Sequence, residues 1–274
     1  MTFIQRHAYD IGAGFASLLW PFFRKRQKVA VENIMRGGIT SDPKEARRIA
    51  RRSFAHFAGH IGEALFVPKV VTKENWREHL DMTSEADPTT VKLLLETPDQ
   101  PIILASSHHG VWEAATNILS FARPMIAIAR VQNNGLVAKW MKKHHFRGPV
   151  TLVNKNRGFT PDVFRHWQEE KSAMTILMDQ HAGNGARLSF FGRPARTYTT
   201  ATRLAMRTGC PIVVGSFVRI APYLYRLVAT GGALTFKKTD DRDAATQILN
   251  DRLEAAIRQY PEQYLWMHRR WRDD

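Results

Sequence analysis

Residues 101–113 read Pro101-Ile102-Ile103-Leu104-Ala105-Ser106-Ser107-His108-His109-Gly110-Val111-Trp112-Glu113. The first part of this stretch is a short apolar run, which is typical of a buried strand. From Val111 to Phe121 the apolar residues have helical spacing instead. The two histidines therefore fall at a strand-to-helix turn, where α/β proteins commonly expose catalytic side chains.

An imidazole and a carboxylate stand five positions apart at this turn, on His108 and Glu113. A carboxylate beside an imidazole fixes its tautomer and stabilises the imidazolium, as a general base requires. The same two residues also fit a simpler interpretation, in which the histidine caps a helix and the acid is favoured by the helix dipole. Motifs elsewhere in the chain are needed to decide between these two interpretations.

Strands and helices alternate from residue 101 onward. We expect strands at 101–106, 125–130, 149–153, 173–179, 211–218 and 223–230. We expect helices at 111–121, 134–146, 160–169, 198–208 and 243–259. Short apolar strands separated by helices predict a largely parallel sheet that is covered on both faces. A short turn through Ala221-Pro222 joins the last two strands, which predicts a hairpin and hence a mixed sheet.

The first hundred residues are expected to be helical. Asp42-Pro43 is a helix start, with Asp42 as the N-cap and Pro43 at the first helical position. His56 and His60 lie one turn apart on this helix, but no third metal ligand is evident, so we interpret them as packing or surface histidines. No repeat or linker divides the chain. We expect one α/β domain at residues 81–274, packed as one unit with a helical, membrane-associating region at residues 1–80.

The composition predicts an anionic partner, because 40 lysines and arginines against 25 acids give a net charge of +15. Nucleic acid, an anionic membrane surface, an acidic carrier or a phosphorylated substrate would fit. The apolar stretch from Ile11 to Phe23 is roughly 20 Å long as a helix, short of a hydrocarbon core of about 30 Å. Pro21 interrupts this stretch, and cations follow it from Arg24 to Lys28. It is either a helix lying in a membrane interface or an ordinary N-terminal core helix.

Other routes to catalysis find little support. The single cysteine, Cys210, excludes an internal disulfide and is expected to be a small buried hydrophobe. We find no Gly-rich phosphate loop, no Gly-x-Ser-x-Gly elbow and no clustered metal ligands. A histidine base that acts directly on a substrate hydroxyl is the remaining simple chemistry, without a metal or a cofactor.

Polar clusters follow several of the predicted strands. The chain has Arg130-Val131-Gln132-Asn133-Asn134 after the second, Asp179-Gln180-His181 after the fourth, and a polar loop at residues 187–197 beyond it. The carboxyl ends of parallel strands share one edge of a sheet, so we expect these groups to converge on His108.

The order of the motifs along nearly the whole chain is specific. The motifs are Val31-Glu32-Asn33-Ile34, His108-x4-Glu113, Arg130-x3-Asn134-x-Leu136, Asp179-Gln180, Phe190-Phe191-Gly192-x3-Ala195-x-Thr197, Leu204-Ala205-x3-Gly209 and Pro261-Glu262-Gln263-Tyr264-Leu265-Trp266-Met267-His268-Arg269-Arg270-Trp271. In this order they resemble the lysophospholipid acyltransferase superfamily and, more narrowly, the late lauroyl and myristoyl transferases of lipid A biosynthesis. The chain departs from that pattern at Val111, where Asn is common, at His181, and at a second histidine, His109, which competes with His108 for the role of the base.

The resemblance implies a glycerolphosphate acyltransferase-like fold and an enzyme at the cytoplasmic face of a bacterial inner membrane, peripheral or with a short N-terminal anchor. It implies transfer of a fatty acyl group from an acyl-carrier-protein thioester to a hydroxyl of a lipid A precursor, an anionic glycolipid. His108 would be the base, Glu113 would orient its ring, and N–H groups near Gly110 or the Arg130 side chain would bind the oxyanion. The expected substrate-binding residues are Gly110, Trp112, Arg130, Asn134, Asp179, Gln180, Arg187, Gly192, Arg193, Thr197 and Arg203, with Arg187, Arg193 and Arg203 suited to phosphate.

Two alternatives stay open on the sequence. The first is an acyltransferase that acts on a lysophospholipid or another glycolipid, with acyl-CoA or acyl carrier protein as the donor carrier. The second is a basic, non-enzymatic nucleic-acid-binding protein. The cations are scattered among membrane-type aromatics and no nucleic-acid motif is recognised, so we expect a membrane surface and no nucleic acid as partner.

Overall fold

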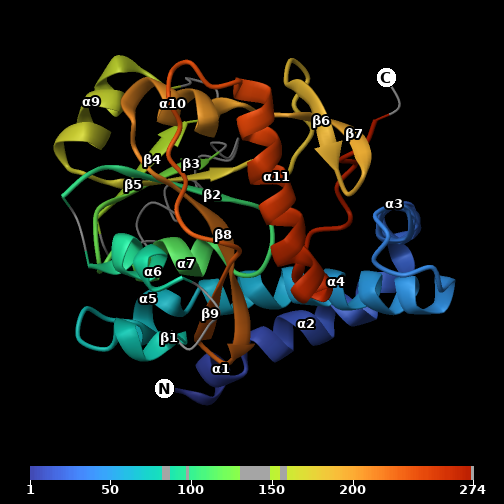
Figure 1. The fold of residues 1–274 in the computed structure, drawn as a ribbon. Helices are drawn as coiled ribbons and strands as arrows, with labels where there is room; N and C mark the ends of the chain where they lie inside the picture. The colour runs from blue at the N-terminus through green and yellow to red at the C-terminus, as the bar shows by residue number, and fades with distance from the viewer. Residues whose placement is uncertain (82–86, 97–98, 130–148, 155–158, 273–274) are drawn as a thin grey trace.

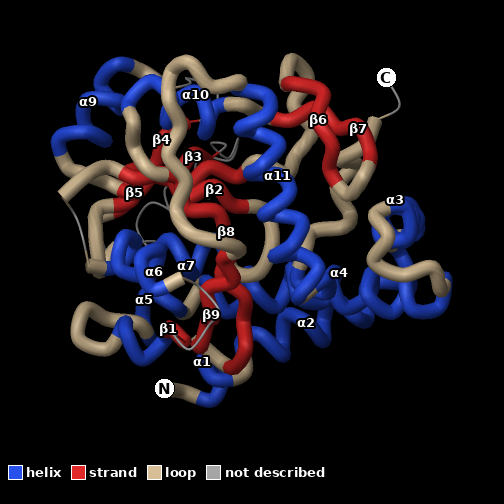
Figure 2. Tube along the Cα trace, in the orientation of Figure 1, coloured by secondary structure: helices blue, strands red, loops and turns tan. Residues whose placement is uncertain are grey.

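The computed structural model describes residues 1–81, 87–96, 99–129, 149–154 and 159–272. A seven-stranded sheet lies at its centre with helices around it (Figures 1 and 2). In spatial order the strands are β1 (Leu80–Asp81), β9 (Leu224–Ala229), β8 (Ile212–Ala221), β2 (Ile102–Ser106), β5 (Ala173–Leu177), β3 (Met125–Ala129) and β4 (Val150–Asn154). All neighbours pair parallel except β8 and β9, which are antiparallel. The predicted mixed, largely parallel sheet is confirmed.

Both faces of the sheet are buried, as the continuous apolar run of β2 predicts. Ile102 and Leu104 belong to one hydrophobic core, whereas Ile103 and Ala105 belong to the other. The first core is completed by α5 (Val67–Val70), α6 (Pro88–Leu95) and α7 (Trp112–Leu119). The second is completed by α9 (Pro161–Glu169), α10 (Thr200–Thr208) and α11 (Arg242–Gln259), together with apolar residues of the N-terminal helices.

The N-terminal region is helical, with α1 (Phe3–Arg6), α2 (Ala8–Leu19), the short 3-10 helix η1 (Trp20–Phe22), α3 (Arg24–Arg36) and α4 (Pro43–Ala64). The predicted start of α4 is confirmed, because the Asp42 side chain accepts a hydrogen bond from the Lys44 N–H at 2.9 Å. α2 lies against α4 along one end of the molecule (Figure 1). Two further 3-10 turns, η2 (Trp76–His79) and η3 (Pro261–Gln263), complete the described elements.

Residues 187–197, predicted to be a loop, instead belong to a hairpin of β6 (Ala186–Phe190) and β7 (Arg193–Thr197). Its two-residue turn, Phe191-Gly192, has φ of 53° and 69°. Positive φ at both central residues is typical of the tight hairpin turn that matches strand twist. The prediction was wrong because these strands are half-exposed and rich in arginine, so they lack an apolar run.

The first hundred residues are not entirely helical, because β1 pairs with β9 at the edge of the sheet. A two-residue strand has no periodicity that a sequence pattern can reveal. The predicted domain boundary falls inside β1, between Leu80 and Asp81, and stays a prediction. The helix predicted at 134–146 lies outside the described residues.

One face of the N-terminal helices is apolar and exposed to solvent. Ile11, Phe15 and Leu18 of α2 are 54%, 64% and 75% exposed, and Phe22 is 81% exposed. The face of α2 that packs on α4 carries small residues such as Ala8 and Ala16 instead. An uncovered apolar helix face favours the interfacial interpretation over an ordinary core helix.

Within the described ranges, none of the helices has both the length and the apolar character needed to cross a bilayer.

Alanine substitutions at two glycines of α2 should have opposite effects on the stability of the protein. A Cβ on Gly12 would lie 2.7 Å from the Ala58 carbonyl oxygen of α4, whereas a Cβ on Gly14 would meet nothing within 4 Å. Gly14→Ala should raise the free energy of unfolding by up to about 1 kcal/mol, since alanine favours the helix. Gly12→Ala should lower it by about 1–3 kcal/mol, because the helices must move apart. Urea unfolding of the two variants checks the contrast, and equal gains in both would contradict the close helix contact.

Candidate active site

The ends of two neighbouring strands bring His108 and Asp179 together. β2 and β5 are parallel with Ser106 opposite Leu177, and His108 and Asp179 each lie two residues further along the chain. His108 Nδ1 is 2.9 Å from Asp179 Oδ1. Because an ionised carboxylate only accepts hydrogen bonds, the Nδ1–H of the ring donates to it.

The other ring nitrogen of His108 has the form that a base needs. With the proton on Nδ1, the Nε2 atom carries the lone pair and accepts a hydrogen bond from the Gln180 side-chain amide at 3.2 Å. The His108 side chain is 17% exposed, whereas the Asp179 side chain is 3% exposed. The basic nitrogen therefore belongs to a partly exposed ring whose other nitrogen is fixed by a buried carboxylate.

The Asp179 carboxyl stays ionised despite its burial. Burial alone would raise its pKa, but the charge on His108 and the hydrogen bonds that His108 donates outweigh this effect, so the pKa is lowered. A buried carboxylate on the far nitrogen holds the imidazole in one tautomer and stabilises the imidazolium that forms when the ring accepts a proton.

The carboxylate bound to Nδ1 is thus Asp179, whereas the sequence pointed to Glu113 for this role. Glu113 lies half-buried in the first turn of α7, where the helix dipole favours a negative charge. Its catalytic role stays a prediction. Trp112, the first residue of α7, packs its ring against His108 with the ring centroids 5.1 Å apart. The sequence had placed Asp179 only in the wider group of binding residues, because strand register cannot be read from spacing along one strand.

His109 is turned away from the accessible side of the turn. It is fully buried, and its Nε2 donates to the Tyr260 carbonyl at 3.1 Å. Burial lowers its pKa to about 4. The geometry therefore favours His108 over its neighbour as the base.

Gly110 is required by the close approach of the turn to β8. Its φ is +70°, and a Cβ would lie 1.9 Å from the Phe217 carbonyl oxygen. The Gly110 N–H donates to the Gln263 carbonyl at 3.0 Å, and the Val111 N–H donates to the Phe217 carbonyl at 2.7 Å. These two N–H groups, which lie where the sequence predicted donors for an oxyanion, therefore already have partners within the protein.

His56 of α4 supports the same turn from the N-terminal side. Its Nε2 donates to the Gly110 carbonyl at 3.1 Å, and its Nδ1 accepts from the Tyr9 hydroxyl at 3.0 Å. Burial lowers the pKa of His56 to about 3, so the ring is neutral. His60 is also buried, and its ring packs on Trp112 at 4.4 Å. Both are packing histidines, as predicted, and no group of metal ligands occurs among the residues whose placement is described.

The C-terminal residues 261–271, here called the C-terminal strap, hold the turn from the other side. The Leu265 N–H donates to the His108 carbonyl at 3.0 Å. The Asn33 side chain of α3 donates to the carbonyls of Trp266 and His268, each at 2.8 Å. The sequence identified the strap as a motif but missed this structural role, since the strap has no regular periodicity and its contacts are with distant elements.

Arg270 of the C-terminal strap connects Gln180 with strand β7 of the β6–β7 hairpin through hydrogen bonds. Its guanidinium is buried and donates to the carbonyls of Gln180 and Arg196 and to the Thr197 hydroxyl. Thr197 is fully buried as well. The Thr197 hydroxyl therefore serves the framework of the protein, and its predicted contact with substrate stays a prediction.

Of the remaining predicted binding residues, those that the structure describes form no hydrogen bond or ring contact with His108. Arg187 and Gly192 are exposed on the hairpin, and Arg203 is exposed on α10. Arg193 is half-buried and its guanidinium lies over the Trp271 ring at 5.4 Å. Their binding roles stay predictions, and Arg130 and Asn134 lie outside the described residues.

Cys210 is buried, as predicted, and burial raises its thiol pKa to about 11.

Two buried histidines near the site, whose pKa values burial lowers, predict a loss of stability in acid. His56 and His109 are neutral when folded and titrate near pH 6.5 when unfolded. Unfolding therefore takes up protons below about pH 6.5, and the free energy of unfolding falls by about 1.4 kcal/mol per pH unit for each ring. Urea unfolding between pH 7.5 and 5 should show this slope, and His109→Gln should reduce it by one ring's share. An unchanged slope in that variant would contradict the assignment.

Comparison with known proteins identifies the family of this fold and site. A family model described as bacterial lipid A biosynthesis acyltransferase matches residues 3–273. The lipid A biosynthesis palmitoleoyltransferase of Escherichia coli (strain K12) and the lipid A biosynthesis acyltransferase of Shigella flexneri are each 24% identical over 272 residues, covering 96% of this chain and 84% of the relative. The chain therefore belongs to the bacterial lipid A biosynthesis acyltransferase family and is an acyltransferase.

Proposed function

We propose that this acyltransferase moves a fatty acyl group from an acyl-carrier-protein thioester to a hydroxyl of a lipid A precursor, with His108 as the general base. The observation that carries the proposal is the His108 ring itself. Its Nδ1–H donates to the buried Asp179 carboxylate, and its Nε2 lone pair accepts a hydrogen bond from the side chain of Gln180. Family membership supports acyl transfer in lipid A synthesis.

In the proposed reaction the acceptor hydroxyl takes the place of the Gln180 amide at His108 Nε2. Nε2 removes the hydroxyl proton while the oxygen attacks the thioester carbonyl carbon, which forms a tetrahedral oxyanion. The carbon–sulfur bond then breaks, and the imidazolium returns the proton to the departing sulfur. An ester and a free thiol are the products, and the histidine is regenerated. Asp179 stabilises the imidazolium between the two proton transfers.

The oxyanion needs hydrogen-bond donors in this scheme. The Gly110 and Val111 N–H groups are already bound to carbonyls. The Gln180 amide lies 3.2 Å from Nε2 and, once displaced by the hydroxyl, is within reach of the reacting carbonyl. The scheme therefore assigns this role to Gln180, with Arg130 as the second donor. Glu113, the carboxylate of the His-x4-Glu motif, completes the proposed site as its second carboxylate in addition to Asp179.

Two further features support the proposed partners and place of action. The net charge of +15 suits an acidic carrier protein and an anionic glycolipid. The exposed apolar face formed by Ile11, Phe15, Leu18 and Phe22 suits peripheral attachment to the cytoplasmic face of the inner membrane. Cations follow immediately in α3, where anionic head groups would meet them.

The proposal is tested by acyl transfer in vitro, with product mass as the readout. Purified protein is given lipid A precursor and either acyl carrier protein or coenzyme A thioesters of several chain lengths. His108→Ala should lower kcat by about 10²–10⁴-fold, because the proton acceptor is lost. Asp179→Asn should lower kcat by a comparable factor, because the ring loses its fixed tautomer. Glu113→Gln should also lose most activity.

The assay also needs a control for the folding of each variant and a comparison between acceptors and between donors. Each variant should unfold in urea as a cooperative unit, so that loss of activity is not loss of structure. Near-normal turnover of folded His108→Ala would overturn the proposed base. Transfer to a lysophospholipid in preference to the lipid A precursor, or from coenzyme A in preference to the carrier protein, would overturn the proposed substrates.

A further inference from the structure

One face of α4 changes its composition half-way along the helix. Ala58, Gly59 and Gly62 pack against α2, where a Cβ on Gly62 would lie 2.7 Å from the Ala8 carbonyl oxygen. Seven residues earlier, which is two helical turns, the same face carries Arg51, Arg52 and Ala55. α2 ends at Leu19, so the cationic half of this face extends beyond it.

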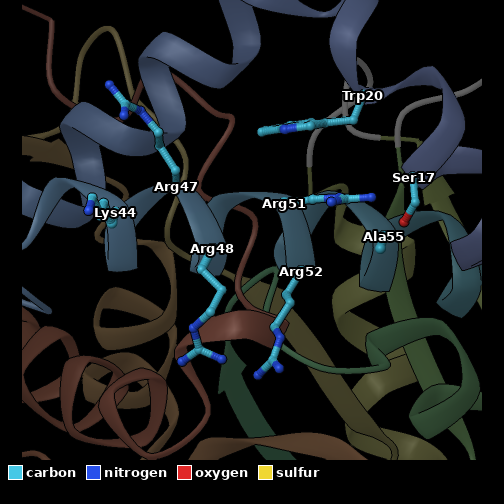
Figure 3. Close-up of a pocket in the computed structure, with 8 residues that line it drawn as sticks. All are labelled: Ser17, Trp20, Lys44, Arg47, Arg48, Arg51, Arg52 and Ala55. Carbon is cyan, nitrogen blue, oxygen red and sulfur yellow. The ribbon is translucent and has the colours of Figure 1, made fainter.

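A pocket of about 570 Å³ lies at this point, within the range of about 300–1,000 Å³ that small ligands occupy. Five of its lining side chains are cations. Figure 3 shows them fanning out from α4, with Arg47 on one side and Arg48 and Arg52 on the other, and with Ser17 and Trp20 closing the end nearest α2. The lining residues are Ser17, Trp20, Lys44, Arg47, Arg48, Arg51, Arg52 and Ala55.

Most of this positive charge is not neutralised within the protein. Glu45 pairs with Arg48. Arg47, Arg51 and Arg52 are exposed, and none of them is in an ion pair in the part of the chain whose structure is described. Arg47 and Arg51, like Arg48 and Arg52, are four residues apart, a spacing at which like charges destabilise a helix. A ligand with more than one negative charge would relieve this repulsion.

The pocket combines groups that suit a phosphate attached to a lipid. Guanidinium groups bind phosphate oxygens in a two-pronged geometry that a point charge cannot give. Trp20 is held in place by the Phe54 ring, 5.1 Å away, and offers an apolar wall with a polar tip. Tryptophan is enriched at the membrane–water boundary for this reason.

The position of the pocket decides between a lipid and a soluble acidic partner. Phe15 and Leu18 lie on the exposed apolar face of α2, and Ser17, between them in sequence, lines the pocket. A helix is about 10 Å across, so the pocket lies within about that distance of the apolar face. Head groups occupy roughly 5–8 Å on each side of the hydrocarbon core. When the apolar face enters the membrane, the pocket is therefore at head-group depth, where a folded protein partner would be obstructed.

The geometry points to a binding site in this pocket for a membrane lipid whose head group carries a phosphate monoester. A monoester supplies up to two charges and three free oxygens, which suits a pocket lined by several arginines. The site goes beyond acyl transfer and does not depend on it. Arg52 is only one turn from His56, which supports the catalytic turn, so a lipid held here lies next to the active site.

Vesicle binding without any acyl donor tests this inference separately from the reaction. The full-length protein is titrated with vesicles of phosphatidylcholine, of phosphatidylcholine with phosphatidic acid, and of phosphatidylcholine with phosphatidylglycerol at matched surface charge. The wild-type protein should bind the phosphatidic acid vesicles most tightly. Arg51→Ala with Arg52→Ala should reduce that binding at least about tenfold, because two of the phosphate-binding cations are lost. Binding to phosphatidylcholine alone, through the apolar face, should be unchanged.

A matched control removes the same charge elsewhere. Lys237→Ala with Lys238→Ala changes two exposed cations of the segment before α11 and should keep the preference for phosphatidic acid. Unchanged binding in the arginine variant would overturn the site. An equal loss on phosphatidic acid and phosphatidylglycerol would also overturn it, because that is the response of a diffuse charged surface. Loss of affinity for acyl carrier protein with intact vesicle binding would instead assign the arginines to a protein partner.

Discussion

The hydrogen bond between the His108 ring and the buried Asp179 carboxylate depends on the register of two parallel strands. Because Ser106 lies opposite Leu177, residues two positions beyond each strand meet at the same edge of the sheet. A shift by one residue would turn each side chain to the other face of the sheet. The surrounding contacts hold this geometry: His56 and the C-terminal strap bind the backbone of the turn, and Arg270 binds the carbonyl of Gln180. The ring is thus positioned by elements from both ends of the chain.

α4 connects this edge of the sheet with the N-terminal helices. Its C-terminal half contacts the catalytic turn through His56 and packs against Trp112 through Phe57 and His60. The Tyr9 hydroxyl, from α2, completes a chain of hydrogen bonds through His56 to Gly110. The helix that exposes apolar residues to solvent is therefore joined to the catalytic turn through a buried, neutral histidine. The cationic pocket lies on the same α4 helix, starting one turn before His56, so this helix joins the groups that we propose for membrane attachment, lipid binding and catalysis.

Much of the fold and part of the site could be predicted from the sequence, and the differences have physical reasons. Apolar runs bounded by turns located the strands of the central sheet outside β1, since strands buried on both faces leave that pattern. The rule that parallel strands end at one edge predicted that Asp179 and Gln180 lie near His108. Glu113 received the ring-orienting role because it is near in sequence, whereas the bond to Nδ1 depends on strand register. The hairpin at β6 and β7 and the framework role of Thr197 were missed because their stabilising partners, such as Arg270, come from distant segments.

Nitrogen-15 NMR of the histidine rings tests whether Asp179 fixes the tautomer of His108. We expect the neutral His108 ring to carry its proton on Nδ1, with Nε2 unprotonated. The Nδ1–H resonance should move in Asp179→Asn and stay in place in Glu113→Gln. A neutral ring with its proton on Nε2 in the wild-type protein, or a resonance that responds to Glu113→Gln and not to Asp179→Asn, would show that Asp179 does not hold the ring.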